Sequence, residues 1–344
     1  MFLSTIIVNN LIFFLIFCLF VYFSTIKFDL ISNLFKIYDA PDKERKFHKK
    51  KISLLGGFLF IFAILLCIFY VYFFKDFDLE SAKYSINYKK FFSFFISSFL
   101  IFILGFVDDK YNLPANKKLL FLFIIILATL NLDESLVLKE LKFSFFDNDL
   151  HLNKLSIFIT VFCFLLFINS FNMFDGINLQ SGIYFLQTLI VLIYYKFLTN
   201  LLLILLIFNF LFIFLNFKNK AFLGNGGSLL LGYLISYFFI EAYQAKLIIY
   251  ADFVFLVMMI PGYDLLRLFL ERAYNKRHPF SPDRNHIHHL LLNRFGFFYS
   301  FLIIQFLIGI GLVLNLIFAL SLFLSILIGT LFYSMTIIYC RYKT

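Results

Sequence analysis

The sequence has little charge. Only 15% of its 344 residues are Asp, Glu, Lys or Arg, while 62% are hydrophobic. Soluble domains are about a quarter charged and about half apolar on average, so an ordinary globular domain is excluded. The mean hydropathy of +0.92 indicates a protein that lies in a lipid bilayer.

Several other features are missing as well. The four cysteines lie in or at the end of apolar runs without metal-site spacing, so we interpret them as packing residues. No basic segment precedes the first apolar run, and the first lysine is Lys27. We therefore expect that run to remain as a membrane helix and not to be a cleaved signal peptide. No linker divides the chain, which predicts a single integral membrane domain over 1–344.

What the sequence does contain is a series of apolar runs. A membrane-spanning helix needs about 20 mostly apolar residues, and the shorter runs must borrow flanking residues. The fold class we predict is all-α, a polytopic membrane helix bundle of about 10–11 transmembrane helices. The candidate runs are 2–24, 54–74, 91–107, 119–130, 155–168, 179–198, 201–217, 229–240, 249–270, 297–316 and 319–339. The segment between the fourth and fifth runs alternates around Asp147 to Asp149 and predicts a small hairpin.

Basic residues are distributed unequally between the loops. Most of the 30 Lys and Arg fall in 25–52, 108–118, 218–228, 267–296 and the C-terminal tail. Because basic loops mark the cytoplasmic side, we expect the N-terminus outside and these loops inside. Nearly all of the net charge of +10 therefore falls on that face, which favours anionic lipid headgroups or a polyphosphate substrate as partners. Nucleic acid is not favoured, because no recognition fold accompanies the charge.

Two adjacent carboxylates, Asp108 and Asp109, follow the third apolar run. Ionisable groups at that depth are usually functional, and a pair of acids suits either a divalent cation or a general base. A solvated helix end is the alternative interpretation. Lys118 adds a cation that attracts phosphate.

A second polar segment holds Asn172, Asp175 and Asn178. Residues three apart share one face of a helical turn, so the first two side chains point the same way. Amides beside a carboxylate suit recognition of a nucleobase or sugar and ligation of a metal. Helix capping is an alternative that explains any one of the three residues, but it does not explain all three together.

The third segment, FLGNGGS, places Gly224, Asn225, Gly226 and Gly227 before an apolar run. A glycine-rich turn at a helix N-terminus presents backbone N–H groups to phosphate. A simple turn with a Ser228 cap is the alternative.

The fourth segment contains Arg284, His286, His288 and His289. Zinc is one ligand to consider, but the absence of cysteine and the excess of base favour an anion such as a diphosphate. A solvated basic loop is the bland alternative. Apart from Asp264 and Arg267, the ionisable groups lie at the ends of the runs, which argues against a transporter.

In this order and spacing, the segments resemble the polyprenyl-phosphate N-acetylhexosamine-1-phosphate transferases of glycosyltransferase family 4. The resemblance runs from Asp39 to His289 and is carried by DAPDKERKFH, the Asp pair, Lys118, NxxD, FLGNGGS and RNHIHH. The HIHH form is closer to the branch that initiates O-antigen lipid carriers than to muramoyl-pentapeptide transferase.

The resemblance implies transfer of a sugar 1-phosphate from a UDP-sugar to undecaprenyl phosphate, with release of UMP, in the bacterial inner membrane. It implies Mg²⁺ as cofactor, with Mn²⁺ as a substitute, and leaves a homodimer open. The implied roles are catalysis by Asp108, Asp109 and Asp175, metal ligation by Asp108, Asn178 and Asn225, and substrate binding by Lys118, Asn172, Gly224, Gly227, Arg284, His286, His288 and His289.

The sequence departs from the family pattern at two acidic positions. Asn225 stands where the family has a metal-ligating Asp, and Asn178 is also an amide. Loss of one carboxylate beside Mg²⁺ removes an attraction on the order of several kcal/mol, so we expect a weaker metal site. The alternative is a catalytically weakened or inactive relative that binds the lipid carrier or UDP-sugar as a partner.

Overall fold

A computed structural model gives the fold. It describes residues 30, 32–33, 37–39, 51–74, 88–278 and 284–341. The first apolar run and the basic residues of the first loop up to Lys50 lie outside the described residues.

Helices make up most of the described chain, and ten of the predicted apolar runs each coincide with one helix. The all-α prediction is therefore confirmed. The helices are α3 (Gly56–Phe74), α4 (Tyr88–Tyr111), α5 (Ala115–Leu132), α6 (Ser156–Phe174), α7 (Gln180–Tyr194), α8 (Thr199–Phe217), α9 (Gly224–Gln244), α10 (Ala251–Tyr274), α11 (Ile287–Leu316) and α12 (Leu322–Arg341). Two 3₁₀ turns, Glu134–Leu136 and Asn153–Leu155, flank the loop after α5.

Six of these helices are long and apolar enough to cross a membrane, namely α4, α5, α6, α10, α11 and α12. Shorter apolar stretches occur in α3, α7 and α8. The run predicted over 229–240 is part of a longer helix, as expected for a short run. Helix α9 begins at Gly224 and includes the whole GNGGS segment.

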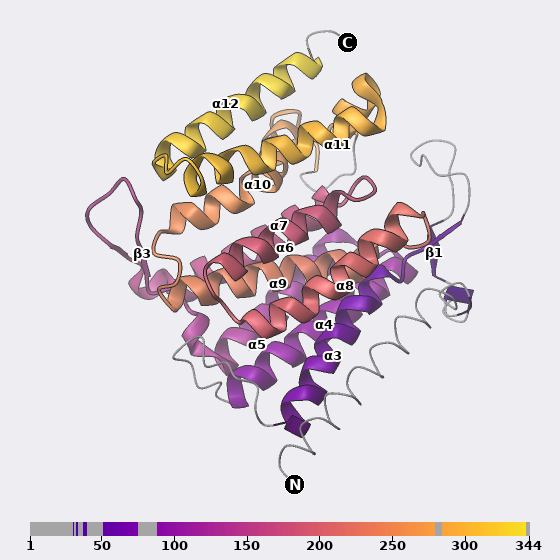
Figure 1. The fold of residues 1–344 in the computed structure, drawn as a ribbon, viewed down its shortest axis with the longest axis vertical. Coiled ribbons are helices and arrows are strands. Elements are labelled where there is room, and N and C mark those ends of the chain that lie inside the picture. The colour runs from indigo at the N-terminus through magenta and orange to yellow at the C-terminus, as the bar shows by residue number, and fades with distance from the viewer. Residues whose placement is uncertain are drawn as a thin grey trace.

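Helix α9 runs through the middle of the bundle, with α3, α4 and α5 on one side and α10, α11 and α12 on the other (Figure 1). Every residue from 226 to 240 is buried. It packs mainly on α4 and α6, and also on α3 and α7. A helix that is apolar on all sides belongs in the interior, so α9 is the element around which the others pack.

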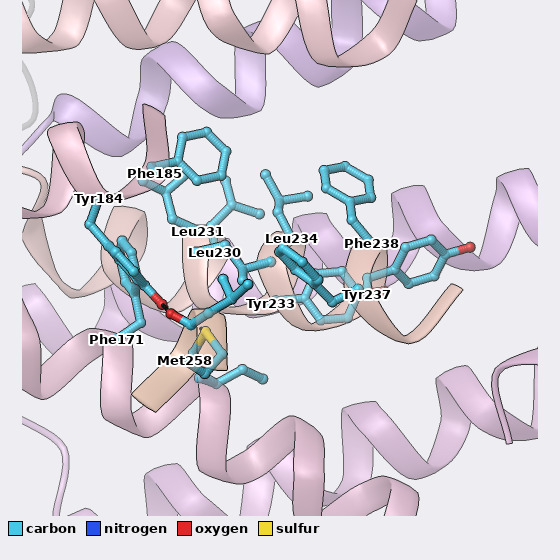
Figure 2. Close-up of a cluster of buried hydrophobic side chains, with 14 of the residues drawn as sticks. Phe171, Tyr184, Phe185, Leu230, Leu231, Tyr233, Leu234, Tyr237, Phe238 and Met258 are labelled. Carbon is cyan, nitrogen blue, oxygen red and sulfur yellow. Dashed lines mark hydrogen bonds between the residues drawn. The ribbon is translucent and has the colours of Figure 1, made fainter. Parts of the chain in front are cut away.

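The core around α9 is rich in aromatic rings. Figure 2 shows the interleaved side chains Phe171, Tyr184, Phe185, Leu230, Leu231, Tyr233, Leu234, Tyr237, Phe238 and Met258. The Tyr184 hydroxyl donates to the Val257 carbonyl at 3.0 Å, which links α7 to α10. Such pairing lets a polar hydroxyl be buried at low cost.

Two short antiparallel hairpins lie at opposite ends of the bundle (Figure 1). One pairs β1 (Tyr38–Asp39) with β2 (Ile52–Ser53). The other pairs β3 (Glu140–Leu141) with β4 (Leu150–His151), which confirms the hairpin predicted from the alternation around Asp147. Strand β2 also bridges to Ala221, just before α9, so the β1 end of the bundle is the end at which α9 starts.

Glycines let α9 approach its neighbours closely. A Cβ at Gly105 of α4 would lie 2.4 Å from the carbonyl oxygen of Asn225, and one at Gly57 of α3 would lie 2.5 Å from the Cα of Gly227. Both distances are too short for any side chain. The close approach fixes the start of α9 against the ends of α3 and α4.

We predict that Gly105→Ala destabilises the protein. The new methyl group collides with backbone, and overpacking of this kind costs about 1–3 kcal/mol. Thermal unfolding in detergent should show a midpoint several degrees lower. Gly309→Ala is the matched control, because a Cβ there meets nothing within 4 Å and alanine is the better helix former. Equal midpoints for the two variants would contradict the close packing.

Candidate functional site

The site begins where the end of α4 meets the start of α9. Asp109 accepts hydrogen bonds from the backbone N–H groups of Asn225 at 2.8 Å and Gly226 at 3.1 Å. Gly224 has φ of +70°, and a Cβ on it would lie 2.7 Å from the Asp109 carboxylate, so glycine is required here. The amides expected to bind phosphate are thus bonded to the protein's own carboxylate.

Asp108 is turned toward α5. One carboxylate oxygen accepts from the Leu113 N–H at 2.8 Å and the other from the Lys118 ammonium at 2.9 Å. Asp108 is 4% exposed, so this is a largely buried ion pair. Lys118, expected to bind substrate phosphate, is paired here with Asp108. Breaking such a pair is strongly destabilising, because a buried charge is left alone.

The end of α6 approaches α9 from the opposite side. Asn172 accepts a hydrogen bond from the Ser228 hydroxyl at 2.5 Å, which ties the predicted NxxD segment to the GNGGS turn. Asp175 ends α6, and one of its oxygens accepts from the Ser181 hydroxyl at 2.6 Å. Burial raises the pKa of Asp175 to about 6, and the Ser181 hydrogen bond lowers it in part.

Two amides expected to ligate metal have different surroundings. The Asn178 side chain donates to the Asn219 side chain at 2.6 Å, in the segment that follows α8. The Asn225 side chain makes no hydrogen bond within the described residues, so its amide is open to a ligand. With Asp108 also held by protein donors, two of the three expected metal ligands already have partners in the protein.

The histidine segment joins the site at the start of α11. His288 is 2% exposed, and a Cβ on Gly176 would lie 2.0 Å from its Nε2. Its ring therefore rests on the residue next to Asp175. His288 Nδ1 is buried without a hydrogen-bond partner among the described residues. The ring of His289 is 4.3 Å from that of His288, whereas Arg284 is exposed.

Direct contacts thus link residues from distant parts of the chain at the β1 end of the bundle. Asp109 touches the start of α9, Ser228 of α9 touches Asn172, and Gly176 touches His288. Gly227 is buried against Gly57, where it serves helix packing. These contacts place all four predicted polar segments in one neighbourhood. The functional role of each residue stays a prediction.

Four contacting residues were not anticipated. Ser181 binds Asp175, Asn219 binds Asn178, and Asp264 and Arg267 of α10 hold the histidine segment. The sequence could have identified Asp264 and Arg267, because they are an ionisable pair within an apolar run and such residues are usually functional. Nothing in the sequence marked Ser181 or Asn219.

The donor chemistry separates the two metals considered. Within the described residues, no group of three or more His, Cys, Asp or Glu side chains is placed to hold a metal ion. The histidine segment therefore gives no support for zinc. The second carboxylate oxygen of Asp175 and the Asn225 amide are hard oxygen donors, which fit Mg²⁺ when a diphosphate supplies further oxygens.

Comparison with known proteins identifies the same family as the motifs. Residues 91–243 match the model of glycosyl transferase family 4. The chain is 26% identical over 296 residues to the undecaprenyl-phosphate alpha-N-acetylglucosaminyl 1-phosphate transferase of Thermotoga maritima, covering 86% of this chain and 85% of the relative.

Other relatives match over a shorter stretch. A probable undecaprenyl-phosphate N-acetylglucosaminyl 1-phosphate transferase of Bacillus subtilis is 28% identical over 205 residues, or 57% of each chain. The Escherichia coli K12 undecaprenyl-phosphate alpha-N-acetylglucosaminyl 1-phosphate transferase is 28% identical over 210 residues, and the match spans 58% of this chain and 56% of that relative. The chain thus spans little more than half the length of these two relatives.

We predict that Asp175→Asn stabilises the metal-free protein at alkaline pH. The pKa of Asp175 is about 6 in the folded protein against an ordinary 3.8, so the folded state prefers the protonated form. Ionisation therefore costs stability as pH rises between these values, by up to about 3 kcal/mol. Asparagine stays neutral and avoids this cost.

Thermal unfolding with a chelator present checks this prediction. The midpoint of Asp175→Asn should exceed that of the parent near pH ~8, and the gap should shrink as the pH falls toward ~4. Asp147→Asn on the exposed β3–β4 hairpin serves as the control, without a pH-dependent gap. A gap that is constant with pH would refute the raised pKa.

Proposed function

Residues 91–243 match the model of glycosyl transferase family 4, and on that premise we propose that the chain transfers a sugar 1-phosphate from a UDP-sugar to a polyprenyl phosphate. UMP is released, and an N-acetylhexosamine is the sugar expected from the names of the relatives. The observation that carries the proposal is the joining of α4, α6, α9 and α11 by direct contacts at one end of the bundle.

The reaction itself is a phosphoryl transfer. An oxygen of the lipid phosphate attacks the β-phosphorus of the UDP-sugar, and the bond from that phosphorus to the UMP oxygen breaks. Both reactants are anions, so the site must align them and offset their repulsion. A location at a membrane surface suits a lipid phosphate that meets a soluble nucleotide.

Among the three candidate carboxylates, Asp175 is the one best suited to contact the attacking phosphate. Asp108 is neutralised by Lys118, and Asp109 is bonded to the start of α9. One oxygen of Asp175 has no donor among the described residues, and its raised pKa suits a group that accepts a proton near neutral pH. In this proposal Asp108 and Asp109 position the helix ends.

Mg²⁺ is the cofactor we propose, with Asp175 and Asn225 as the protein oxygens that would hold it. When bound, it would neutralise charge on the diphosphate. Asn172 and the histidines of α11 would orient the nucleotide sugar. The basic segments 218–220 and 276–278 lie beside these segments in sequence and would raise the local concentration of both anions.

A second function is favoured by one observation. Asn225 replaces the carboxylate that the family motif has at this position, so the protein offers one metal-binding charge fewer. A relative that binds the lipid carrier or nucleotide sugar without turnover would have this property. UMP release separates the two functions.

We expect the purified protein, in detergent with UDP-N-acetylglucosamine, undecaprenyl phosphate and Mg²⁺, to release UMP. Asp175→Ala should lower the rate at least about 100-fold, because a group that acts on the reacting phosphate contributes about 10²–10⁴-fold. Asp147→Ala on the far hairpin should leave the rate unchanged. Folded protein that releases no UMP from several UDP-sugars would reject the transferase and leave the binding function.

A further inference from the structure

A buried carboxylate in α10 has no part in the reaction proposed above. Asp264 is 3% exposed and lies in a mostly apolar helix that also carries Arg267 and Glu271. One of its oxygens accepts from the Arg267 guanidinium at 2.6 Å and the Ile287 N–H at 3.0 Å. The other lies 2.9 Å from Nδ1 of His286. A charge buried this deeply is usually functional.

Arg267 completes the attachment of α10 to the histidine segment. Besides the Asp264 carboxylate, it donates to the carbonyl of Asn285 at 2.7 Å. Three consecutive residues, 285 to 287, are therefore bonded to two side chains one turn apart on α10. The start of α11 is fixed on both its backbone and its first imidazole.

The carboxylate also determines which ring nitrogen of His286 carries a proton. An ionised carboxylate only accepts hydrogen bonds, so Nδ1 of His286 must be the donor. On a ring that carries both protons, Nε2–H is then the donor left for another group.

His286 is coupled to the rest of the site through its neighbour. Its ring is stacked on that of His288, with centroids 5.3 Å apart and planes 12° apart. His288 rests on Gly176, beside Asp175. By holding His286, Asp264 therefore also helps to fix the His288 ring, which lies against the segment that contains Asp175.

We propose that Asp264 is a positioning residue of the active site, which holds a doubly protonated His286 by its Nδ1–H so that Nε2–H binds the diphosphate of the nucleotide sugar. This inference rests on the proposed function. Negative charge builds on the departing UMP oxygen in the transition state, and an imidazolium whose other nitrogen is held by a carboxylate stabilises that charge. Arg267 is the counter-ion of Asp264, at 2.6 Å.

Glu271 provides a matched control. It lies on the same helix, pairs with the same Arg267 at 3.1 Å and is also bonded to Arg341 of α12. The described contacts of Glu271 do not include residues 284–287. Glu271→Gln therefore perturbs the same arginine without touching the histidine.

The experiment compares kcat and KM of Asp264→Asn and Glu271→Gln, using the full chain in detergent with UDP-N-acetylglucosamine and undecaprenyl phosphate. We expect Asp264→Asn to lower kcat about 100-fold while KM for the nucleotide changes less than about threefold, because the lost interaction acts on the transition state. Asp264→Glu should recover part of kcat, and Glu271→Gln should keep kcat within about twofold. Equal losses for Asp264→Asn and Glu271→Gln, or none for either, would overturn the proposal.

A spectroscopic readout keeps the two proposals distinguishable. In ¹⁵N-histidine NMR of the parent, assigned with His286→Gln, His286 should carry protons on both ring nitrogens, and Asp264→Asn should populate the neutral Nε2–H tautomer. This NMR signal does not depend on enzymatic turnover. If Asp264→Asn does not fold, the signal of the parent protein alone still tests the proposal. A parent without activity rejects the proposed function, whereas a His286 without a proton on Nδ1 rejects the role of Asp264.

Discussion

The pairing of Asp109 with the start of α9 is the constraint on which the rest of the structure depends. Helix α9 is buried from 226 to 240, and its first amides have no partner within the helix. In an apolar environment each unsatisfied N–H group costs several kcal/mol. Asp109 satisfies two of them, and in doing so it joins the end of α4 to the start of the central helix.

Once α9 is fixed, its first turn determines where other polar groups lie. Ser228 reaches Asn172 on α6, and Asp175 follows one turn later. Asp175 is buried enough to have a raised pKa, so the site retains a carboxylate that is costly to ionise. On the far side α10 holds the histidine segment through Asp264. Most polar side chains at this end of the bundle are thus bonded to protein partners, while the second oxygen of Asp175 and the Asn225 amide, which have no partner among the described residues, remain for ligands.

Sequence alone predicted much of the fold, because apolar run length reports directly on burial in a bilayer. Ten of the eleven runs correspond to helices, and the alternation near Asp147 predicted a hairpin that is present.

The helix ends were less predictable. The predicted run over 229–240 starts five residues after the first residue of α9. The GNGGS sequence is typical of a turn, and it is helical here because Asp109 accepts hydrogen bonds from its backbone N–H groups. Motif order indicated which segments meet. It did not indicate that Asp109 binds α9, that Lys118 pairs with Asp108, or that Asp264 holds His286, because each pairing joins side chains through folding and leaves no local pattern.

Amide hydrogen exchange at the start of α9 tests this central claim most directly. In the parent protein, the N–H groups of Asn225 and Gly226 should exchange slowly, as hydrogen-bonded amides do. Asp109→Ala should accelerate exchange at these two amides, while Asp147→Ala on the exposed β3–β4 hairpin should leave them unchanged. Rapid exchange at both amides in the parent, or protection that survives Asp109→Ala, would contradict the account.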